Sequence, residues 1–397
     1  MARIILYKGQ SNYGSLRLHV DQLGSALRKS GHNVIIIDLM EKYSLTNLNR
    51  ELNNKPDFVL GFNGIGIDLT SQGKSIYDIV NVPYIAAIVD HPHFHIERLS
   101  TKMNQLYVTC LDRSHLKFLR TYFPEKHIKG SMLWMPGGNR IISNDINVDS
   151  KEKYLDRDIS ILFTGTFRGE PERGWKNYAP SIKSLLDNIT DKVLSSNLLS
   201  YENALETVLN ELNMDLSKEQ INKMNLLMPL VDSFVHAYRR YTFLEQLAQH
   251  NLNIDLYGIG WEKMKSKWSS FTFNGEGSFS DTLIKLKKAK IVLNTNYNFV
   301  DGGHERVFAA MINGAAIITD PSKVYMEEFQ DKQDIFFYDW KQLDSVPANI
   351  TNLLENPDEL WEVAVSGQKK VLKSHTWEAR AEQLIDFVEL NKIIYSL

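Results

Sequence analysis

The segment IILYKGQSNYGSLRLHVDQLGSALRKSGHNVIIID (Ile4–Asp38) determines the fold expected for this chain. It begins with a short apolar run, Ile4–Tyr7, and passes through the glycine-bearing turn Gly9–Ser15. Apolar residues then recur at helical spacing between Leu16 and Leu27. The continuous apolar run Val34–Asp38 is typical of a strand buried on both faces. A strand, a helix and a strand in this order predict a parallel sheet with right-handed crossovers.

The same alternation continues and predicts two facing, doubly wound α/β domains. Further strands are expected at 58–60, 84–89, 106–109, 159–163, 254–257, 272–273, 291–294 and 316–319. Residues 180–250 carry helix signals without strand signals and predict a helical insert. The predicted domains are 1–150 and 151–375, with the polar stretch 144–158 as a linker and a closing helix at 376–397.

Composition excludes several classes of protein. The chain has 397 residues and a net charge of -3, so no overall basic excess favours binding to nucleic acid. The single cysteine, Cys110, excludes an internal disulfide framework and a multi-cysteine zinc site. The first residues lack the pattern of a signal peptide, and no apolar run reaches the length of a membrane span. A cytoplasmic protein is therefore expected.

The segment Asn294–Pro321 predicts a binding loop in the second domain. Gly302 and Gly303 precede a predicted helix, where a phosphate can approach backbone N–H groups and the positive end of the helix dipole. Arg306 in the first turn would add a charge-assisted hydrogen bond, and Glu305 would accept hydrogen bonds from ribose hydroxyls. The alternative is that the glycines form a simple turn and Glu305 is a favourable acid at a helix start.

The segment Val82–Leu99 brings Asp90, His91, His93 and His95 to the carboxyl end of a predicted strand in the first domain. These groups can move protons near neutral pH, so Asp90, His91 and His93 are the predicted catalytic residues. Three histidines and an acid are also zinc-ligand types. Alternate histidines in an extended loop point in different directions, however, so no metal site is predicted, and a structural role is the remaining alternative.

Other strand ends give weaker candidates. The turn Gly9–Ser15 would contact an acceptor or a phosphate, although a glycine turn after a strand is common without any such role. Arg168 would neutralise a diphosphate or lie solvated at the surface. The glycine loops Tyr257–Trp261 and Asn274–Ser280 suit backbone contacts with a base. The chain contains no G-x-G-x-x-G, P-loop or nucleophile-elbow motif.

Four segments resemble GT-B glycosyltransferases, and the resemblance extends over essentially the whole chain. They are NYGSLRLHVDQLGSALRKSGHNVIIIDL (12–39), FTGTF (163–167), GGHERVFAAMINGAAIITD (302–320) and HTWEARAEQLIDFV (375–388). The HERVF form is most similar to the CgeB-like, group-1-related bacterial branch. The resemblance implies a nucleotide sugar in the cleft between two Rossmann-like domains and a terminal helix that packs back toward the first domain.

The implied activity is transfer of a sugar from a nucleoside-diphosphate sugar to a hydroxyl acceptor in bacterial glycan or glycoconjugate synthesis, without a metal or other cofactor. The implied donor-binding residues are Gly165, Thr166, Arg168, Tyr257, Gly258, Gly302, Gly303, His304, Glu305 and Arg306. Tyr13, Gly14 and His95 are the expected acceptor-side residues. The acceptor would be a glycan, a lipid-linked glycan or a protein, with no nucleic-acid partner. Peripheral membrane association and oligomerisation stay open.

One departure from the family pattern affects the mechanism. Retaining members often carry two glutamates eight positions apart, but this chain has Asp301 and Ala309 at those positions. Glu305, one helical turn before Ala309, would substitute in binding the ribose. Retention or inversion is left open, and an inverting route would use Asp90 or a neighbouring histidine as base. A nucleotide-sugar epimerase and a non-catalytic carbohydrate-binding or assembly protein are the alternatives.

Overall fold

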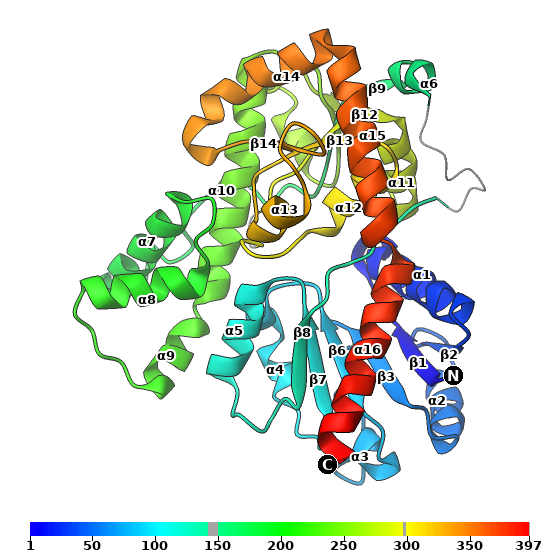
Figure 1. The fold of residues 1–397 in the computed structure, drawn as a ribbon. Coiled ribbons are helices and arrows are strands. Elements are labelled where there is room, and N and C mark those ends of the chain that lie inside the picture. Colours follow the sequence, from blue (N-terminus) through cyan, green and yellow to red (C-terminus); the bar gives the residue numbers. More distant parts are fainter. Residues whose placement is uncertain (142–149, 297–298, 397) are drawn as a thin grey trace. The chain divides into compact units, whose positions relative to one another are not determined.

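The computed structural model describes residues 1–141, 150–296 and 299–396, and the chain divides into two compact units (Figure 1). The first unit comprises Met1–Asn139 and His375–Leu397, and the second comprises Arg140–Ser374. From residue 144 to 149 the predicted linker lies outside the described residues. Its remainder belongs to the second unit, because the short helix α6 (Lys151–Leu155) packs there through the buried Tyr154.

The first unit contains a sheet of six parallel strands in the order β2-β1-β3-β6-β7-β8. The strands are β1 (Arg3–Lys8), β2 (Asn33–Asp38), β3 (Phe58–Phe62), β6 (Tyr84–Ile88), β7 (Leu106–Cys110) and β8 (Gly130–Leu133), and β4 (Thr70–Ser71) and β5 (Lys74–Ser75) form a separate hairpin. The helices are α1 (Ser15–Lys29), α2 (Ser44–Asn53), α3 (Ile76–Val80), α4 (Ile96–Leu99), α5 (Arg113–Tyr122) and α16 (Trp377–Ser396).

Helices cover both faces of this sheet, as a doubly wound domain requires. On one face, Leu23 of α1 and Leu384 of α16 share a buried cluster with Leu6 of β1. On the other face, Leu48 of α2 packs in a cluster with Val59 of β3. Burial on both faces explains why the strands are continuous apolar runs rather than alternating ones.

The second unit contains another six-stranded parallel sheet, in the order β11-β10-β9-β12-β13-β14. The strands are β9 (Ile159–Thr164), β10 (Asp255–Tyr257), β11 (Thr272–Phe273), β12 (Ala289–Leu293), β13 (Ala316–Thr319) and β14 (Phe336–Phe337). The helices that follow α6 are α7 (Pro180–Leu194), α8 (Tyr201–Glu211), α9 (Lys218–Asn225), α10 (Met228–Gln249), α11 (Phe279–Lys288), α12 (Glu305–Ile312), α13 (Lys323–Glu328), α14 (Val346–Glu355) and α15 (Pro357–Ser374). The strand order reverses direction between β9 and β12, which makes that position the switch point of the sheet.

The 22-residue helix α10 is shared between two hydrophobic cores. Its first half, including Val231 and Val235, packs with α7 and α8 in the helical insert. Its second half, including Phe243 and Leu247, packs against the sheet. A residue in the middle of α10 therefore has a position fixed by both cores.

The predicted doubly wound fold, helical insert and closing helix are confirmed. A strand occurs at every predicted position. The sequence did not predict β8, β14 or the β4–β5 hairpin. β4 and β5 contain no apolar residue, and β8 begins with glycine and serine, so these three segments lack the apolar run of a buried strand.

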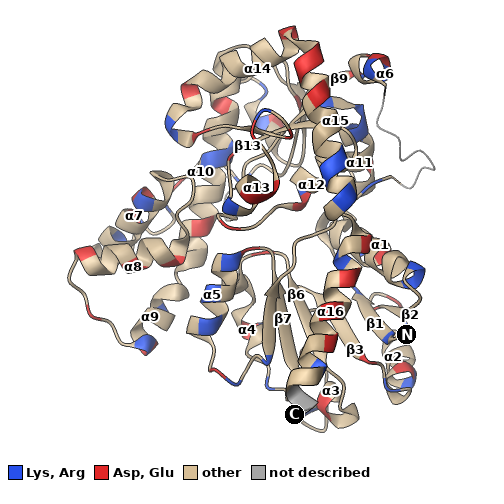
Figure 2. Ribbon diagram, viewed as in Figure 1, with Lys and Arg blue, Asp and Glu red and all other residues tan. Residues whose placement is uncertain are grey.

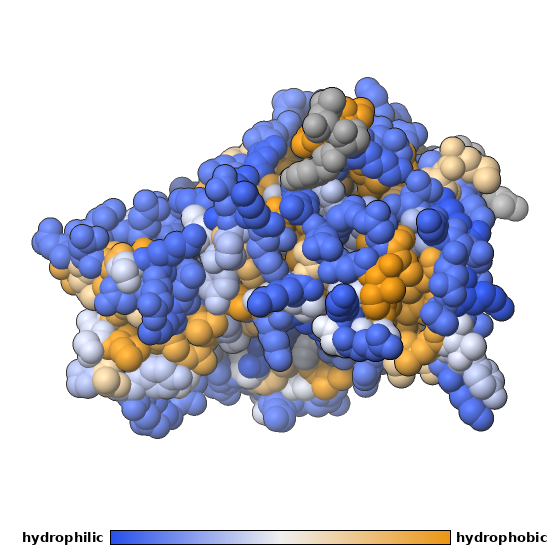
Figure 3. Space-filling model, turned by 90° about the horizontal axis from the view of Figure 1, so that it is seen from below, coloured by the Kyte–Doolittle hydropathy of each residue, from blue (hydrophilic) through white to orange (hydrophobic). Residues whose placement is uncertain are grey.

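Charges of both signs are interspersed along the helices of both units (Figure 2), in keeping with the net charge of -3. The face seen from below is largely hydrophilic and carries separate hydrophobic areas (Figure 3). Within the described residues, no helix combines the length and apolarity needed to cross a bilayer.

Close packing fixes the start of α16 in the first unit. The indole of Trp377 donates to Oδ1 of Asn139 (2.9 Å), and the indole of Trp134 donates to the carbonyl of Arg380 (2.9 Å). A Cβ atom at Gly137 would lie 2.7 Å from the backbone nitrogen of Trp377. Because that nitrogen cannot move without displacing the helix, the chain needs glycine here.

We expect Gly137→Ala to lower the free energy of unfolding of the first unit by about 1–3 kcal/mol, the usual cost of an overpacked site. Gly174→Ala is the matched control, because a Cβ there meets nothing within 4 Å. Thermal and urea unfolding of both variants provide the measurement. Equal stability of the two variants would contradict the close packing of α16.

Candidate functional site

The switch point of the second sheet lies at the carboxyl ends of β9 and β12. In open parallel sheets, ligands bind outside the strand ends at such a point, because the flanking helices leave on opposite faces. Thr164 ends β9 and Asn294 follows β12, and both are buried. The side chains that reach these two residues define the candidate site.

Arg306, in the first turn of α12, connects the two strand ends. Its Nε donates to the hydroxyl of Thr164 (3.1 Å), and its Nη1 donates to Oδ1 of Asn294 (2.7 Å). Its guanidinium also lies 5.8 Å from the ring centroid of Phe163 in β9. These two hydrogen bonds fix the guanidinium at the ends of both strands, and a guanidinium binds phosphate oxygens through charge-assisted hydrogen bonds.

Arg240 of α10 supplies a second cation at the end of β9. Its Nη1 donates to the carbonyl of Thr166 (2.6 Å), and its guanidinium lies 5.7 Å from the ring centroid of Phe163. A Cβ atom at Gly165 would lie 3.1 Å from Cζ of Arg240, and Gly165 has φ +154°. Two guanidinium groups thus pack against the same phenylalanine ring.

His236 lies one helical turn before Arg240 on α10 and is only 6% exposed. Burial lowers its pKa most, and the charges of Arg240, Arg168, His304 and Arg306 lower it further, to well below the ordinary value. The predicted Arg168 and Arg306 are therefore close enough to act on one buried group. The imidazole of His236 is neutral in this environment.

The first turn of α12 is organised by its own side chains. Nδ1 of His304 lies 3.1 Å from the backbone nitrogen of Arg306 and 2.8 Å from Oε2 of Glu305. An unprotonated Nδ1 accepts from the Arg306 N–H, whereas a protonated Nδ1 donates to Glu305. Tyr325 accepts a hydrogen bond from the His304 N–H (2.7 Å).

The role predicted for Gly302 and Gly303 has a competing explanation. Both residues are buried, and a Cβ at Gly303 would lie 2.9–3.0 Å from the rings of Phe308 and Tyr325. The hydroxyl of Ser322 donates to the carbonyl of Gly302 (2.6 Å). Packing is therefore sufficient to require glycine at 303.

The loops after β9 and β10 contact each other at the two predicted glycines. The Gly165 N–H donates to the carbonyl of Tyr257 (2.9 Å), and the indole of Trp261 donates to the carbonyl of Gly165 (2.6 Å). A Cβ at Gly258, where φ is +142°, would lie 2.1 Å from the Gly165 carbonyl oxygen. The four predicted residues Gly165, Thr166, Tyr257 and Gly258 therefore lie in two loops that pack tightly against each other beside the switch point.

Beyond β12, the chain is held by the buried Asp320. Its Oδ1 accepts from the backbone N–H of Asn296 (2.6 Å), and its Oδ2 accepts from the indole of Trp340 (2.8 Å). Burial raises the pKa of Asp320, although the positive charge of Arg239 acts to lower it. Thr295 Oγ1 and Asn296 Oδ1 are buried without a hydrogen-bond partner, which leaves two polar atoms for a ligand or water.

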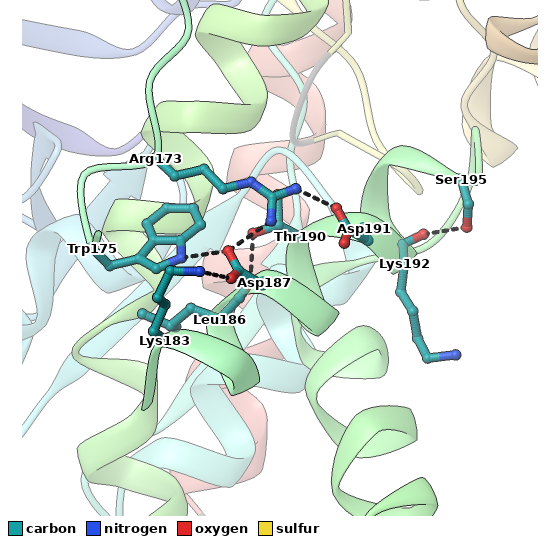
Figure 4. Close-up of polar contacts among 9 residues, drawn as sticks. All are labelled: Arg173, Trp175, Lys183, Leu186, Asp187, Thr190, Asp191, Lys192 and Ser195. Atoms are coloured by element: carbon teal, nitrogen blue, oxygen red, sulfur yellow. Dashed lines mark hydrogen bonds and ion pairs between the residues drawn. The ribbon is translucent and has the colours of Figure 1, made fainter. Parts of the chain in front are cut away.

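Ion pairs attach the loop that carries Arg168 to α7 (Figure 4). Nη1 of Arg173 lies 2.6 Å from Oδ1 of Asp187, and its other amino group pairs with Asp191. The indole of Trp175 donates to the same Asp187 oxygen (2.9 Å). Burial acts to raise the pKa of Asp187, but hydrogen bonds from Lys183, Arg173 and Trp175 lower it to about 2. The Asp187 carboxylate is therefore ionised at neutral pH.

In the first unit, Asp90 follows β6 and is held by Asn63. The Asn63 Nδ2 donates to Oδ2 of Asp90 (2.9 Å), and its Oδ1 accepts from the Val89 N–H (2.9 Å). Nε2 of His95 lies 3.6 Å from the same carboxylate oxygen. The structure thus brings the predicted Asp90 and His95 together. Asn63, which has φ +51°, was not predicted.

The predicted His91 and His93 lie deeper, in a buried aromatic cluster. Their ring centroids are 4.0 Å apart, and the ring of His115 in α5 lies 4.4 Å from that of His91. Burial, followed by the charges of neighbouring histidines, lowers the pKa of both His91 and His93 well below the ordinary value. Among the described residues, no group of three or more histidines, cysteines or acids could hold a metal ion.

Tyr13 and Gly14 lie in the turn after β1, at the switch point of the first sheet. Both have left-handed backbone geometry, with φ of +59° and +78°. Tyr13 is 36% exposed. The turn is therefore an irregular surface segment at the carboxyl edge of the first sheet.

Comparisons with known proteins bear on the fold of the chain. Residues 239–386 match a family model described as glycosyl transferase-like, and no curated protein matches. Among solved structures, sucrose-phosphate synthase from Thermosynechococcus elongatus is 12% identical, with both chains fully covered and a TM-score of 0.56. Anabaena HepE with UDP-glucose is 9% identical, covering 98% of this chain and 100% of that one, with a TM-score of 0.55.

An alpha-glucosyltransferase in complex with UDP-glucose and DNA is also 9% identical, covering 98% of each chain, with a TM-score of 0.54. The chain has the GT-B fold. The two six-stranded parallel sheets are its two Rossmann-like domains. In GT-B terms, the switch point described above belongs to the C-terminal domain.

We expect the first unit to lose stability as the pH falls from 6.5, because its unfolded state then protonates His91 and His93 while the native state does not. Well below pH 6.5, each such histidine lowers the free energy of unfolding by about 1.4 kcal/mol for each pH unit. His91→Asn keeps an acceptor for the His93 N–H. This variant should reduce the dependence of the free energy of unfolding on pH by the contribution of one histidine. His32→Asn is the control for replacing a histidine by asparagine, because Nδ1 of His32 also accepts a backbone N–H. An unchanged slope in His91→Asn, measured by urea unfolding from pH 7 to 5, would contradict a neutral buried His91.

Proposed function

We propose that this protein is a glycosyltransferase that moves a sugar from a nucleoside-diphosphate sugar to a hydroxyl acceptor. One observation supports this most strongly: Arg306 connects the ends of β9 and β12 at the switch point, with Arg240 on the same phenylalanine ring. The glycosyl transferase-like match spans both arginines. The GT-B structures similar to this chain include complexes with UDP-glucose.

The proposed chemistry follows from the charge of the leaving group. When the bond between the sugar and the diphosphate breaks, negative charge develops on the departing phosphate oxygen. Arg306, Arg240 and Arg168, together with the positive end of the α12 dipole, would stabilise that charge. Fixed guanidinium groups supply the role that a divalent cation has in other transferases, so we propose metal-independent transfer.

Residues of the first unit are proposed to activate the acceptor. A hydroxyl is a weak nucleophile and gains reactivity when a base removes its proton. Asp90 is half exposed, and Asn63 fixes its orientation, so we propose it as the base, with His95 beside it. The buried His91 and His93 would support this loop rather than contact the acceptor.

We propose the remaining donor contacts because these residues lie near the carboxyl ends of the strands of the second sheet. Glu305 would accept hydrogen bonds from the ribose, and the loops at Gly165 and Gly258 would approach the nucleotide through their backbones. A bacterial glycan or glycoconjugate as acceptor and membership of the CgeB-like branch are further proposals, carried by the HERVF segment (304–308).

Calorimetry with a panel of nucleotide sugars, including UDP-glucose and GDP-mannose, tests the donor site. We expect one donor class to bind, and Arg306→Gln to weaken it ten- to a hundredfold, as expected for a lost charge-assisted hydrogen bond. Arg50→Gln, at an exposed arginine of the first unit, should leave the affinity unchanged. No binding by a folded protein, or equal binding by Arg306→Gln, would refute the donor site.

Product analysis with the donor that binds distinguishes transfer from epimerisation. Donor with a mixture of candidate acceptors should release nucleoside diphosphate and form a new glycoside. An altered sugar on an intact nucleotide would indicate an epimerase instead. Binding without either product would favour a non-catalytic role.

A further inference from the structure

Three buried tyrosines pack behind the loop that follows β3 in the first unit. They are Tyr7 of β1, Tyr77 of α3 and Tyr84 of β6, and each is at most 1% exposed. The hydroxyls of Tyr7 and Tyr77 lie 2.8 Å apart, and the ring centroids of Tyr77 and Tyr84 lie 4.8 Å apart. A buried phenol needs a hydrogen-bond partner, so the partners of these hydroxyls show what the cluster holds in place.

Two of the hydroxyls donate to the backbone of that loop. The Tyr84 hydroxyl donates to the carbonyl of Ile65 (2.5 Å), and the Tyr77 hydroxyl donates to the carbonyl of Gly66 (2.5 Å). Burial raises the pKa of both phenols well above the ordinary value, so both remain protonated donors at neutral pH. The tyrosine cluster therefore fixes two consecutive residues of the loop.

Two glycines let the loop approach the tyrosines this closely. Gly66 has φ +81°, and a Cβ atom there would lie 2.7 Å from the ring of Tyr7. A Cβ at Gly61 would lie 2.3 Å from the Tyr84 hydroxyl and 2.4 Å from the carbonyl oxygen of Ile65. The backbone could not keep these contacts with a larger residue at either position.

The same loop carries Asn63, which has left-handed backbone geometry with φ of +51°. The chain reverses at this residue, because the Ile65 N–H donates to the carbonyl of Phe62 (3.1 Å). A non-glycine residue keeps a positive φ only where its surroundings fix it. The hydrogen bond from Tyr84 to Ile65 fixes the end of this turn, and with it the direction of the Asn63 side chain.

We propose that Tyr84 and Tyr77 are positioning residues for the proposed base Asp90. Their hydroxyls fix the loop backbone, the loop fixes Asn63, and Nδ2 of Asn63 donates to Oδ2 of Asp90 (2.9 Å). The inference rests on the proposed function, because Asp90 acts as a base only if the protein transfers a sugar to a hydroxyl. The tyrosines act from the core of the first unit and do not need to touch the acceptor.

Steady-state kinetics of Tyr84→Phe, with the donor and acceptor identified by product analysis, measures this role. We expect kcat to fall about ten- to a hundredfold, since a misplacement of about 1 Å at a reacting group has an effect of this order. The affinity for the donor, measured by calorimetry, should stay unchanged, because the proposed donor residues lie in the second unit.

Two variants control for the loss of a buried hydroxyl and for lost stability. The buried hydroxyl of Tyr154 also donates to a backbone carbonyl, that of Lys290 (2.8 Å), but in the second unit. Tyr154→Phe should therefore retain kcat. Gly137→Ala should retain it too, because it destabilises the first unit at α16 and leaves the loop after β3 intact.

Hydrogen exchange provides a readout that needs no turnover. The Val89 N–H donates to Oδ1 of Asn63 (2.9 Å), so it should exchange faster in Tyr84→Phe and at the wild-type rate in Tyr154→Phe. Unchanged exchange at Val89 in Tyr84→Phe would show that the tyrosine does not hold Asn63 and would overturn the inference.

A double-mutant cycle separates positioning from a general structural role. Asn63→Ala removes the amide that holds Asp90, so Tyr84→Phe should lower kcat little further in that background. Independent, additive losses in the cycle, or an unchanged kcat in Tyr84→Phe alone, would overturn the inference and leave the proposed function intact. Absence of transfer by the folded wild type with every donor and acceptor would instead overturn the proposed function.

Discussion

The guanidinium of Arg306 joins the ends of β9 and β12, and the candidate site depends on this contact. A parallel sheet leaves an opening at its switch point because the connecting helices depart on opposite faces. In this unit a cation that donates to Thr164 and Asn294 lies at that position. The tight loops at Gly165 and Gly258 pack beside it. Sheet topology and one side chain together specify where an anion is attracted.

Helix α10 explains why the insert matters to the site. A helix that packs only on the sheet would need no extra core, but α10 extends into the insert and buries residues in both. This double anchorage holds Arg240 in place at the end of β9. The ion pairs between Arg173 and the aspartates of α7 fix the loop that carries Arg168. The insert therefore stabilises two of the cations at the site.

The fold could be predicted from the sequence because buried parallel strands require continuous apolar runs, such as Val34–Asp38. Arg306 could be identified because it follows a glycine pair at a helix start. Arg240 and His236 could not, since the apolar stripe around them on α10 is equally typical of a core helix. The position of Arg240 beside Phe163 appears only when tertiary packing brings α10 to β9. Local patterns cannot show such convergence.

Two further residues illustrate the same limit. Asn63 orients Asp90 from a loop 27 positions earlier, and its left-handed φ has no signature in the sequence. Gly303 was predicted to admit a phosphate, whereas the rings of Phe308 and Tyr325 already require a glycine there. Residues that fit their own local pattern were recognised, and those defined by distant neighbours were not.

A crystal structure of the protein with a bound nucleoside-diphosphate sugar tests the central claim most directly. The account predicts phosphate oxygens within hydrogen-bonding distance of the Arg306 guanidinium, at the carboxyl ends of β9 and β12. A nucleotide bound elsewhere, for example at the carboxyl edge of the first sheet, would contradict the account.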